Sequence, residues 1–252
     1  GMATYVSRFD GTAATTEDFV QAIADGACAD GQPLGFDLAK FRQWYHQAGT
    51  PHLEVKRSWD AAVGQMTVQM TQTTSATPGQ PEKQPLVLPL AMALVGPEGR
   101  LGDEALVVME GDTMTTTLQG QPNSSPPALS FLRRFSAPLI VQMDQSLQEN
   151  LQLFSADDDP FSRWDAGQRL ARQVLLARAQ GGRDQAVEAA LIEAMQQRIT
   201  AGQAQDRADL AALLSLPGMA ELEALQSPVD PLALYDAMRS WTEELGRQLQ
   251  AP

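Results

Sequence analysis

The stretch LEVKRSWDAAVGQMTVQM, residues 53–70, decides the fold of this chain. Apolar and polar residues alternate from Leu53 and Val55 onward, and after a turn at residues 60–64 the alternation returns between Met66 and Met70. Successive side chains of a strand point to opposite faces, so a period of two marks a strand with one buried face. The stretch therefore predicts a β-hairpin.

The sequence downstream of this hairpin continues the β pattern. Short runs rich in apolar and β-branched residues are separated by Pro, Gly and Asn, as in Gly96-Pro97-Glu98-Gly99. The predicted strands are Leu86 to Val95, Ala105 to Glu110, Met114 to Leu118, Leu129 to Phe135 and Leu139 to Met143. About seven strands in about 90 residues are typical of an immunoglobulin-like β-sandwich.

The sequence before the hairpin has a helical period. Thr15 or Thr16 precedes acidic residues as a helix cap, and a loop rich in Gly and Asp, residues 25–35, is expected to end that helix. A second helix is predicted from Phe36 to Tyr45, which Gly49 and Pro51 stop.

Helical periodicity returns after about residue 147. Asp159 is expected to cap a helix that begins at Pro160 and ends at Gly181-Gly182, and apolar faces predict further helices around 187–199, 210–214 and 232–249. Such helices stack as a bundle or a superhelix, although no clear repeat is visible in the sequence. The predicted fold class is multidomain α+β, divided into a helical segment (1–49), a β-sandwich domain (50–145) and a helical domain (146–252).

Composition limits the possible functions. The chain has 252 residues, a formal charge of −13 and one cysteine, Cys28. Such a charge repels a phosphate backbone, so nucleic-acid binding is not expected. No apolar run is long enough to cross a membrane, and the single cysteine fits a reducing compartment, so we predict a cytoplasmic protein.

Both histidines, His46 and His52, lie in RQWYHQAGTPHLEV, residues 42–55. Their spacing across Gly49 and Pro51 puts them on different elements, whereas a zinc site needs about three ligands in one place, and no HExxH occurs. We interpret His46 as the end of a helix and His52 as the start of a strand, so the stretch is a joint between domains.

Three other groups of residues are candidate sites. The cluster Asp157-Asp158-Asp159 could bind calcium or act as an acid/base pair, but its place before Pro160 favours a helix N-terminus. Asp165 and Arg169 are spaced as a surface or interdomain ion pair. Cys28 lies in a polar region with no partner for nucleophilic catalysis.

Aromatic residues could line a ligand pocket, but their helical or strand spacing favours core or domain-interface anchors. These residues are Trp44, Tyr45, Trp59, Trp164 and Trp241. No catalytic, cofactor-binding or metal-binding residue is assigned.

Several strings occur together in order. They are RFDGTAATTEDFVQAIADG, FRQWYHQAGTPHLEV, EKQPLVLPLAMAL, RRFSAPL and DPFSRWDAGQRLA. Together they closely resemble the bacterial alanyl aminopeptidases, the aminopeptidase N group of gluzincin zinc peptidases. The resemblance continues into ALLSLPGMAEL and VDPLALYDAMR and covers nearly the whole chain.

The resemblance implies an internal piece of a longer peptidase: the end of its catalytic domain, its β-sandwich and the start of its C-terminal helical domain. Zinc would belong to the parent protein, because the family's HExxH and GAMEN motifs match nothing here. The piece is predicted to be inactive alone and to brace the catalytic domain and begin the lid over the active site. Its expected partners are the catalytic and N-terminal domains of the same polypeptide and, for the parent, peptide substrates.

A free-standing protein- or peptide-binding module is the alternative. Both hypotheses predict apolar patches near the first helices and the last one. A reading frame that continues upstream into HExxH would exclude the free-standing module.

Overall fold

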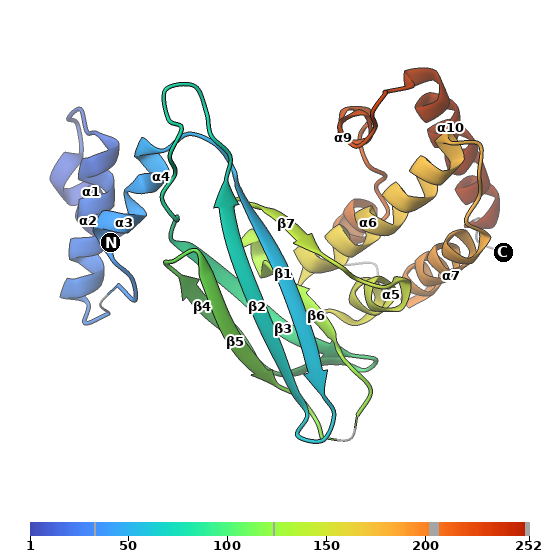
Figure 1. The fold of residues 1–252 in the computed structure, drawn as a ribbon, viewed down its shortest axis with the longest axis horizontal. Coiled ribbons are helices and arrows are strands. Elements are labelled where there is room, and N and C mark those ends of the chain that lie inside the picture. Colours follow the sequence, from blue (N-terminus) through green and yellow to red (C-terminus); the bar gives the residue numbers. More distant parts are fainter. Residues whose placement is uncertain (33, 123, 202–206, 250–252) are drawn as a thin grey trace.

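The computed structural model describes residues 1–32, 34–122, 124–201 and 207–249. Figure 1 shows a β-sandwich in the middle, with a small group of helices on one side and a larger helical part on the other. The described elements therefore follow the order that the sequence predicts, helices, then strands, then helices. None of the described helices is long and apolar enough to cross a membrane.

The N-terminal helices are α1 (Met2–Phe9), α2 (Thr16–Ala29), α3 (Leu38–Phe41) and α4 (Gln43–His46). Thr15, one of the two predicted caps, caps α2, and it forms a capping box with Asp18. Helix α2 continues to Ala29, so the prediction of a loop from residue 25 was wrong. Gly26 marks a close contact instead of a helix end: it is buried inside α2, and a Cβ there would lie 2.5 Å from the Cα of Gly1, so glycine lets the chain at the start of α1 approach α2.

Two further predictions about this part were wrong. The continuous helix expected from Phe36 to Tyr45 is two single turns, α3 and α4, that are divided at Arg42. Helix α1 was not predicted at all. It buries no residue fully, so its sequence pattern is not that of a core helix.

The sandwich consists of two sheets. Its strands are β1 (Pro51–Asp60), β2 (Gln65–Thr74), β3 (Leu88–Gly96), β4 (Gly99–Met109), β5 (Thr113–Gln119), β6 (Ala128–Phe131) and β7 (Ile140–Met143). One sheet has the order β5-β2-β1-β7 and the other β4-β3-β6. The predicted hairpin is present as the antiparallel pair β1–β2, in which Val55 lies opposite Met70, while β7 runs parallel to β1.

Strand β3 is buried on both faces. Leu90, Met92 and Leu94 belong to the core between the two sheets. Val95, whose side chain points the other way, joins Ala128 of β6 in the core of the helical part. A nearly continuous apolar run is expected for a strand covered on both sides, so β3 links the two cores.

Two strand predictions had wrong limits. Strand β4 begins at Gly99 instead of Ala105, directly after the β3–β4 turn. The strand expected from Leu129 to Phe135 stops at Phe131, because Leu132, Arg134 and Phe135 have positive φ angles of 55°, 55° and 53°. That backbone cannot continue a strand.

The helical part contains α5 (Leu147–Ala156), α6 (Pro160–Ala179), α7 (Gln185–Ala201), α8 (Arg207–Leu213), α9 (Met219–Ala224) and α10 (Pro231–Gln248). Asp159 caps α6 and Pro160 occupies its first position, as predicted. Helix α6 contacts α5, α7, α8 and α10, so it is the central helix of this part (Figure 1).

Candidate functional site: the two joints of the sandwich

Arg133 is the centre of the joint between the sandwich and the helical part. Only 3% of this residue is exposed. Its guanidinium donates to Glu104 Oε2 (2.7 Å), Asp157 Oδ1 (2.6 Å) and Asp158 Oδ1 (2.5 Å), and to Ser130 Oγ (3.0 Å). Glu104 and Ser130 belong to the sandwich, whereas both aspartates precede α6, so one buried arginine ties strands to helices.

The backbone around Arg133 is unusual. Leu132, Arg134 and Phe135 all adopt left-handed φ angles, which non-glycine residues rarely do. The Arg134 N–H donates to Asp159 Oδ2 (3.0 Å), an oxygen that also accepts from the N–H of Ser162 (3.0 Å) in the first turn of α6. The turn is thus held by the same carboxylate that caps the central helix.

Two carboxylates of this joint, Glu104 and Asp158, are stabilised in their charged forms. Hydrogen bonds from Arg134, which outweigh the effect of burial, and from Arg133 lower the pKa of Glu104 to about 2. Burial acts to raise the pKa of Asp158, but hydrogen bonds from Arg133 and Arg100 hold that pKa below its ordinary value. Burial also acts against the charge of Arg133, yet its acceptors Glu104, Asp158 and Asp157 raise its pKa overall. These groups remain charged at neutral pH.

Other polar contacts cross the same joint. Arg57 of β1 pairs with Glu149 of α5 and donates to the Asp144 carbonyl oxygen (2.5 Å). The side chains of Gln152 and Gln145 donate to the carbonyl oxygens of Val95 and Leu129, respectively. The joint therefore combines a shared apolar core with bonds to the backbone of both β3 and β6.

The cluster Asp157-Asp158-Asp159 lies at a helix N-terminus, as favoured, and Asp159 is the cap. Asp157 and Asp158 also bind Arg133, which was not predicted. Sequence reasoning missed Arg133 because its partners lie 24 to 29 residues away. One signal could have drawn attention to it: two adjacent arginines directly after a buried strand, followed by three consecutive aspartates in a chain with few cations.

The joint between the N-terminal helices and the sandwich is built differently. Trp44 of α4 packs against the sandwich core and donates from Nε1 to the Val87 carbonyl oxygen (2.8 Å). Gln47 and Gln84 exchange two hydrogen bonds, of 3.0 and 2.8 Å, between side chain and backbone. Gln80 binds the backbone on both sides of Gln47. This joint thus has one large apolar anchor and several polar contacts.

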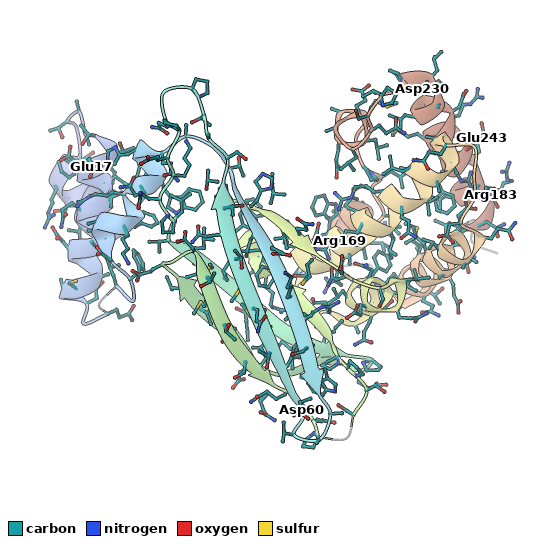
Figure 2. All side chains as sticks on the ribbon, viewed as in Figure 1. Glu17, Asp60, Arg169, Arg183, Asp230 and Glu243 are labelled. Carbon is teal, nitrogen blue, oxygen red and sulfur yellow. The ribbon has the colours of Figure 1, made fainter. Side chains whose placement is uncertain are left out.

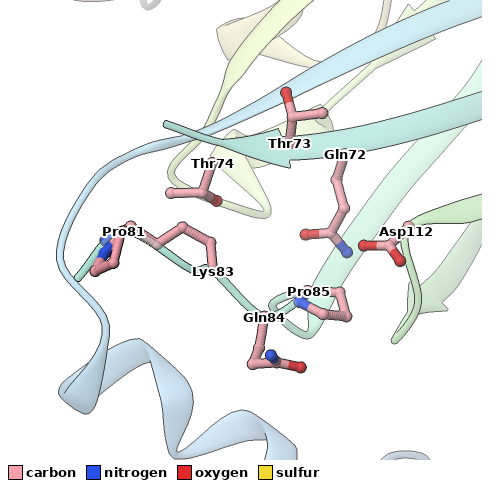
Figure 3. A pocket seen from close by; sticks show the side chains of 8 residues that line it. All are labelled: Gln72, Thr73, Thr74, Pro81, Lys83, Gln84, Pro85 and Asp112. Atoms are coloured by element: carbon pink, nitrogen blue, oxygen red, sulfur yellow. The ribbon is translucent and has the colours of Figure 1, made fainter. Parts of the chain in front are cut away.

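A hollow of about 250 Å³ lies beside this second joint (Figure 3). It is lined by Gln72, Thr73, Thr74, Pro81, Lys83, Gln84, Pro85 and Asp112. Two of its polar side chains are engaged: Lys83 Nζ donates to Ala48 O (2.9 Å), Thr77 Oγ1 (2.6 Å) and Gln80 Oε1 (3.1 Å), and the Gln72 amide is bonded to backbone. The hollow therefore has no ammonium donor left for a ligand.

The histidines are placed as predicted. His46 is the last residue of α4 and His52 is an exposed residue at the start of β1. Glu17 of α2, which the sequence marked only as an acidic residue of the first helical turn, lies 3.2 Å from His46 Nε2 and also pairs with Arg42 at 2.7 Å. Cys28 is exposed on α2. The stretch 42–55 is thus a joint in the structure.

The aromatic residues are anchors of different kinds. Trp241 is fully buried in the helical core, with the Arg178 guanidinium 4.8 Å from its ring. Trp59 is half-buried against the sandwich core, and the Trp164 indole donates to Ser215 Oγ (3.3 Å). Tyr45 is exposed.

Asp165 and Arg169 form the predicted ion pair on α6. Figure 2 shows the position of Arg169 on that helix. Within the described ranges, no three His, Cys, Asp or Glu residues are arranged to hold a metal ion. The arrangement of described side chains is that of a scaffold with two joints.

The comparisons with known proteins agree with this architecture. A family model described as a domain of unknown function with an Ig-like fold (DUF3458) matches residues 49–144. A second, described as DUF3458_C with ARM repeats, matches residues 147–252. The class is therefore an Ig-like domain followed by ARM-type helices, which confirms the predicted fold class.

Relatives with known names point to one family. The chain is 40% identical over 238 residues to aminopeptidase N of Caulobacter vibrioides, covering 94% of this chain and 26% of that protein. It is 33% identical over 258 residues to aminopeptidase N of Escherichia coli, covering 99% of this chain and 29% of that protein. Nearly the whole chain is thus homologous to a part of aminopeptidase N, as the sequence resemblance predicted.

A solved structure shares the fold. The crystal structure of Legionella pneumophila aminopeptidase A in complex with aspartic acid matches with a TM-score of 0.77 and 21% identity. The match covers 98% of this chain and 27% of that one. The chain therefore spans only a quarter to three tenths of the proteins that it resembles.

Proposed function

We propose that these 252 residues are a noncatalytic, architectural part of a zinc aminopeptidase that removes N-terminal amino acids from peptides. The observation that carries the proposal is homology to aminopeptidase N along nearly the whole chain but along only 26–29% of those relatives. The sequence contains no HExxH, and the described residues offer no set of ligands that fits zinc. The zinc ion and the chemistry would belong to residues outside this chain.

Two roles follow from the two joints. The sandwich braces the catalytic domain, to which the N-terminal helices would belong, through the joint at Trp44. The helical part begins a lid over the active site, and its rigid attachment at Arg133 supports that role. We also expect the parent protein to be cytoplasmic.

Exposed apolar side chains support contacts with further domains. They gather on α1 and around the connection between α9 and α10: Met2, Val6, Leu225, Val229, Leu232 and Tyr235. Exposed clusters of this kind mark interaction surfaces more often than single exposed side chains do. The catalytic and N-terminal domains of the same polypeptide are the proposed partners.

A chimera tests the proposal. The homologous segment of the Caulobacter vibrioides aminopeptidase N is replaced by these 252 residues, and hydrolysis of an alanyl anilide is measured. We expect activity within about tenfold of the parent, because the joints that brace the catalytic part are retained. The control is a deletion of the segment, which should abolish activity. A folded, zinc-loaded chimera without activity would argue against the bracing role.

A second assay addresses the chain alone. The purified chain is mixed with zinc and the same anilide, and no turnover is expected. Turnover that persists after contaminating peptidase has been removed would overturn the noncatalytic assignment. If the chain alone is inactive and the chimera fails as well, the free-standing binding module becomes the better hypothesis.

A further inference from the structure

The left-handed turn after β6 contacts the corner between α5 and α6 from two sides. On the inner side, Arg133 binds the side chains of Asp157 and Asp158. On the outer side, the Phe135 ring packs against Phe161 of α6, with ring centroids 5.5 Å apart. Two residues of one short turn thus contact both the aspartates before α6 and the aromatic ring in its first turn.

The conformation of this turn depends on those contacts. Left-handed φ angles at Leu132, Arg134 and Phe135 are unfavourable for residues with a side chain, and such a backbone persists only where its surroundings enforce it. Here Leu132 is buried in the sandwich core, and the Arg134 N–H is bound by the Asp159 carboxylate. Phe135 stays 54% exposed, so its ring is held mainly by its contact with Phe161.

The direction of α6 has consequences beyond the turn. Helix α6 packs against α5, α7, α8 and α10, so these helices follow its orientation. We infer that residues Leu132–Phe135 form a strained clamp that fixes the angle of the helical part relative to the sandwich. When the inner contact is lost, the turn relaxes out of the left-handed region and the helical part samples several angles.

The clamp of residues Leu132–Phe135 is thus a specific element that sets the geometry of the joint, beyond general bracing. Its role at an active site rests on the proposed function: if the helical part is a lid, the clamp also determines how far that lid stays open. The two statements are tested separately, because the angle can be measured without any enzymatic reaction.

Spin labels measure the angle in the chain itself. One label is placed at Val63→Cys in the β1–β2 turn and the other at Glu243→Cys on α10, in a Cys28→Ser background. With the clamp intact, we expect one narrow distribution of label-to-label distances. Arg133→Met should at least double its width or add a second peak, and Phe135→Ala should broaden it less.

Two variants serve as matched controls. Arg57→Met removes another charged contact across the same joint, and Arg178→Met removes a largely buried ion pair with Glu188 inside the helical part. Both should keep the narrow distribution. A folded Arg133→Met chain with the parent's distribution would overturn the inference, as would equal broadening in Arg57→Met. If Arg133→Met does not fold, an unchanged distribution in Phe135→Ala overturns it.

The lid is tested in the chimera described above. Arg133→Met in the chimera should raise the rate on a long peptide relative to the rate on the alanyl anilide, by about threefold or more. A broadened distance distribution with an unchanged rate ratio would keep the clamp but contradict the lid role.

Discussion

The two joints of the sandwich differ in how they exclude water. The joint to the helical part shares an apolar core through Val95 and Ala128 and contains an arginine that is 3% exposed. The joint to the N-terminal helices has one half-buried indole, Trp44, and a set of mostly exposed hydrogen bonds. Burial strengthens each polar contact and raises the cost of losing it. The first joint should therefore join two parts into one cooperative unit, and the second should hold a separable segment.

The difference also shows in the cores. Residues of the sandwich take part in the helical core, whereas α1, α2 and α3 contribute to neither of the two cores. The few buried residues of α2, such as Val20 and Ala24, pack locally. The N-terminal helices are thus expected to open before the rest of the chain.

The largest effect is expected for Arg133→Met. The change leaves Asp157 buried without its cation, and an uncompensated buried charge costs about 3–5 kcal/mol. The free energy of unfolding, measured with urea, should fall by that amount in a single transition for strands and helices. Arg100→Met is the control, because its more exposed bond to Asp158 should contribute less than about 1 kcal/mol. A loss below about 1 kcal/mol for Arg133→Met would contradict the comparison.

The next effect concerns the other joint. Trp44→Ala removes the bond to Val87 O and a large half-buried ring, which together should cost about 2–3 kcal/mol. The loss should be local: amide hydrogen exchange should accelerate in α1 to α4 and stay unchanged in β3 and α6. Tyr45→Ala, at an exposed neighbour, should alter exchange little. Faster exchange in α6 would show that the two joints are coupled.

Much of the fold could be predicted because its signals are local. The alternation around Leu53 and the cap at Asp159 depend on neighbours within a few residues, and both predictions were correct. Two helix predictions were wrong: the end of the first helix near residue 25 and the continuous helix through Arg42. Both depend on packing and on backbone geometry that the local pattern does not contain.

The joints could be predicted only in part. The stretch 42–55 was recognisable as a joint, since Gly49 and Pro51 interrupt a helical pattern before a strand pattern begins. The Arg133 joint was not, because nothing in the sequence near Arg133 shows which carboxylates face it. Leu132, Arg134 and Phe135 also adopt positive φ angles, a conformation that local preferences reserve mainly for glycine. Only the surrounding contacts therefore explain this turn.

A smaller effect depends on pH. The pKa of Glu104 is about 2 in the folded chain against an ordinary 4.5, so its contribution is complete above about pH 4.5 and is lost as the pH falls toward 2. Since the side chain is 21% exposed, we expect a contribution on the order of 2 kcal/mol, reduced by solvent screening. Glu104→Gln should be less stable than the parent at pH 7 and equal to it near pH 2. The exposed Glu98→Gln should match the parent throughout, and a Glu104→Gln difference that does not shrink at low pH would contradict this assignment.

The smallest effect concerns the exposed ion pair of the N-terminal joint. Lys40 Nζ lies 3.2 Å from Glu110 Oε2, and the lysine side chain is 52% exposed. Lys40→Met should therefore change the free energy of local opening of α1 to α4, measured by hydrogen exchange, by less than about 1 kcal/mol. About 0.5 M salt should remove the difference by screening. The same salt should leave the Arg133→Met difference nearly intact, because solvent ions do not reach a guanidinium that is buried between two cores. If salt removed both the Lys40→Met and the Arg133→Met differences, the two joints would be equally accessible to solvent, which would contradict the comparison.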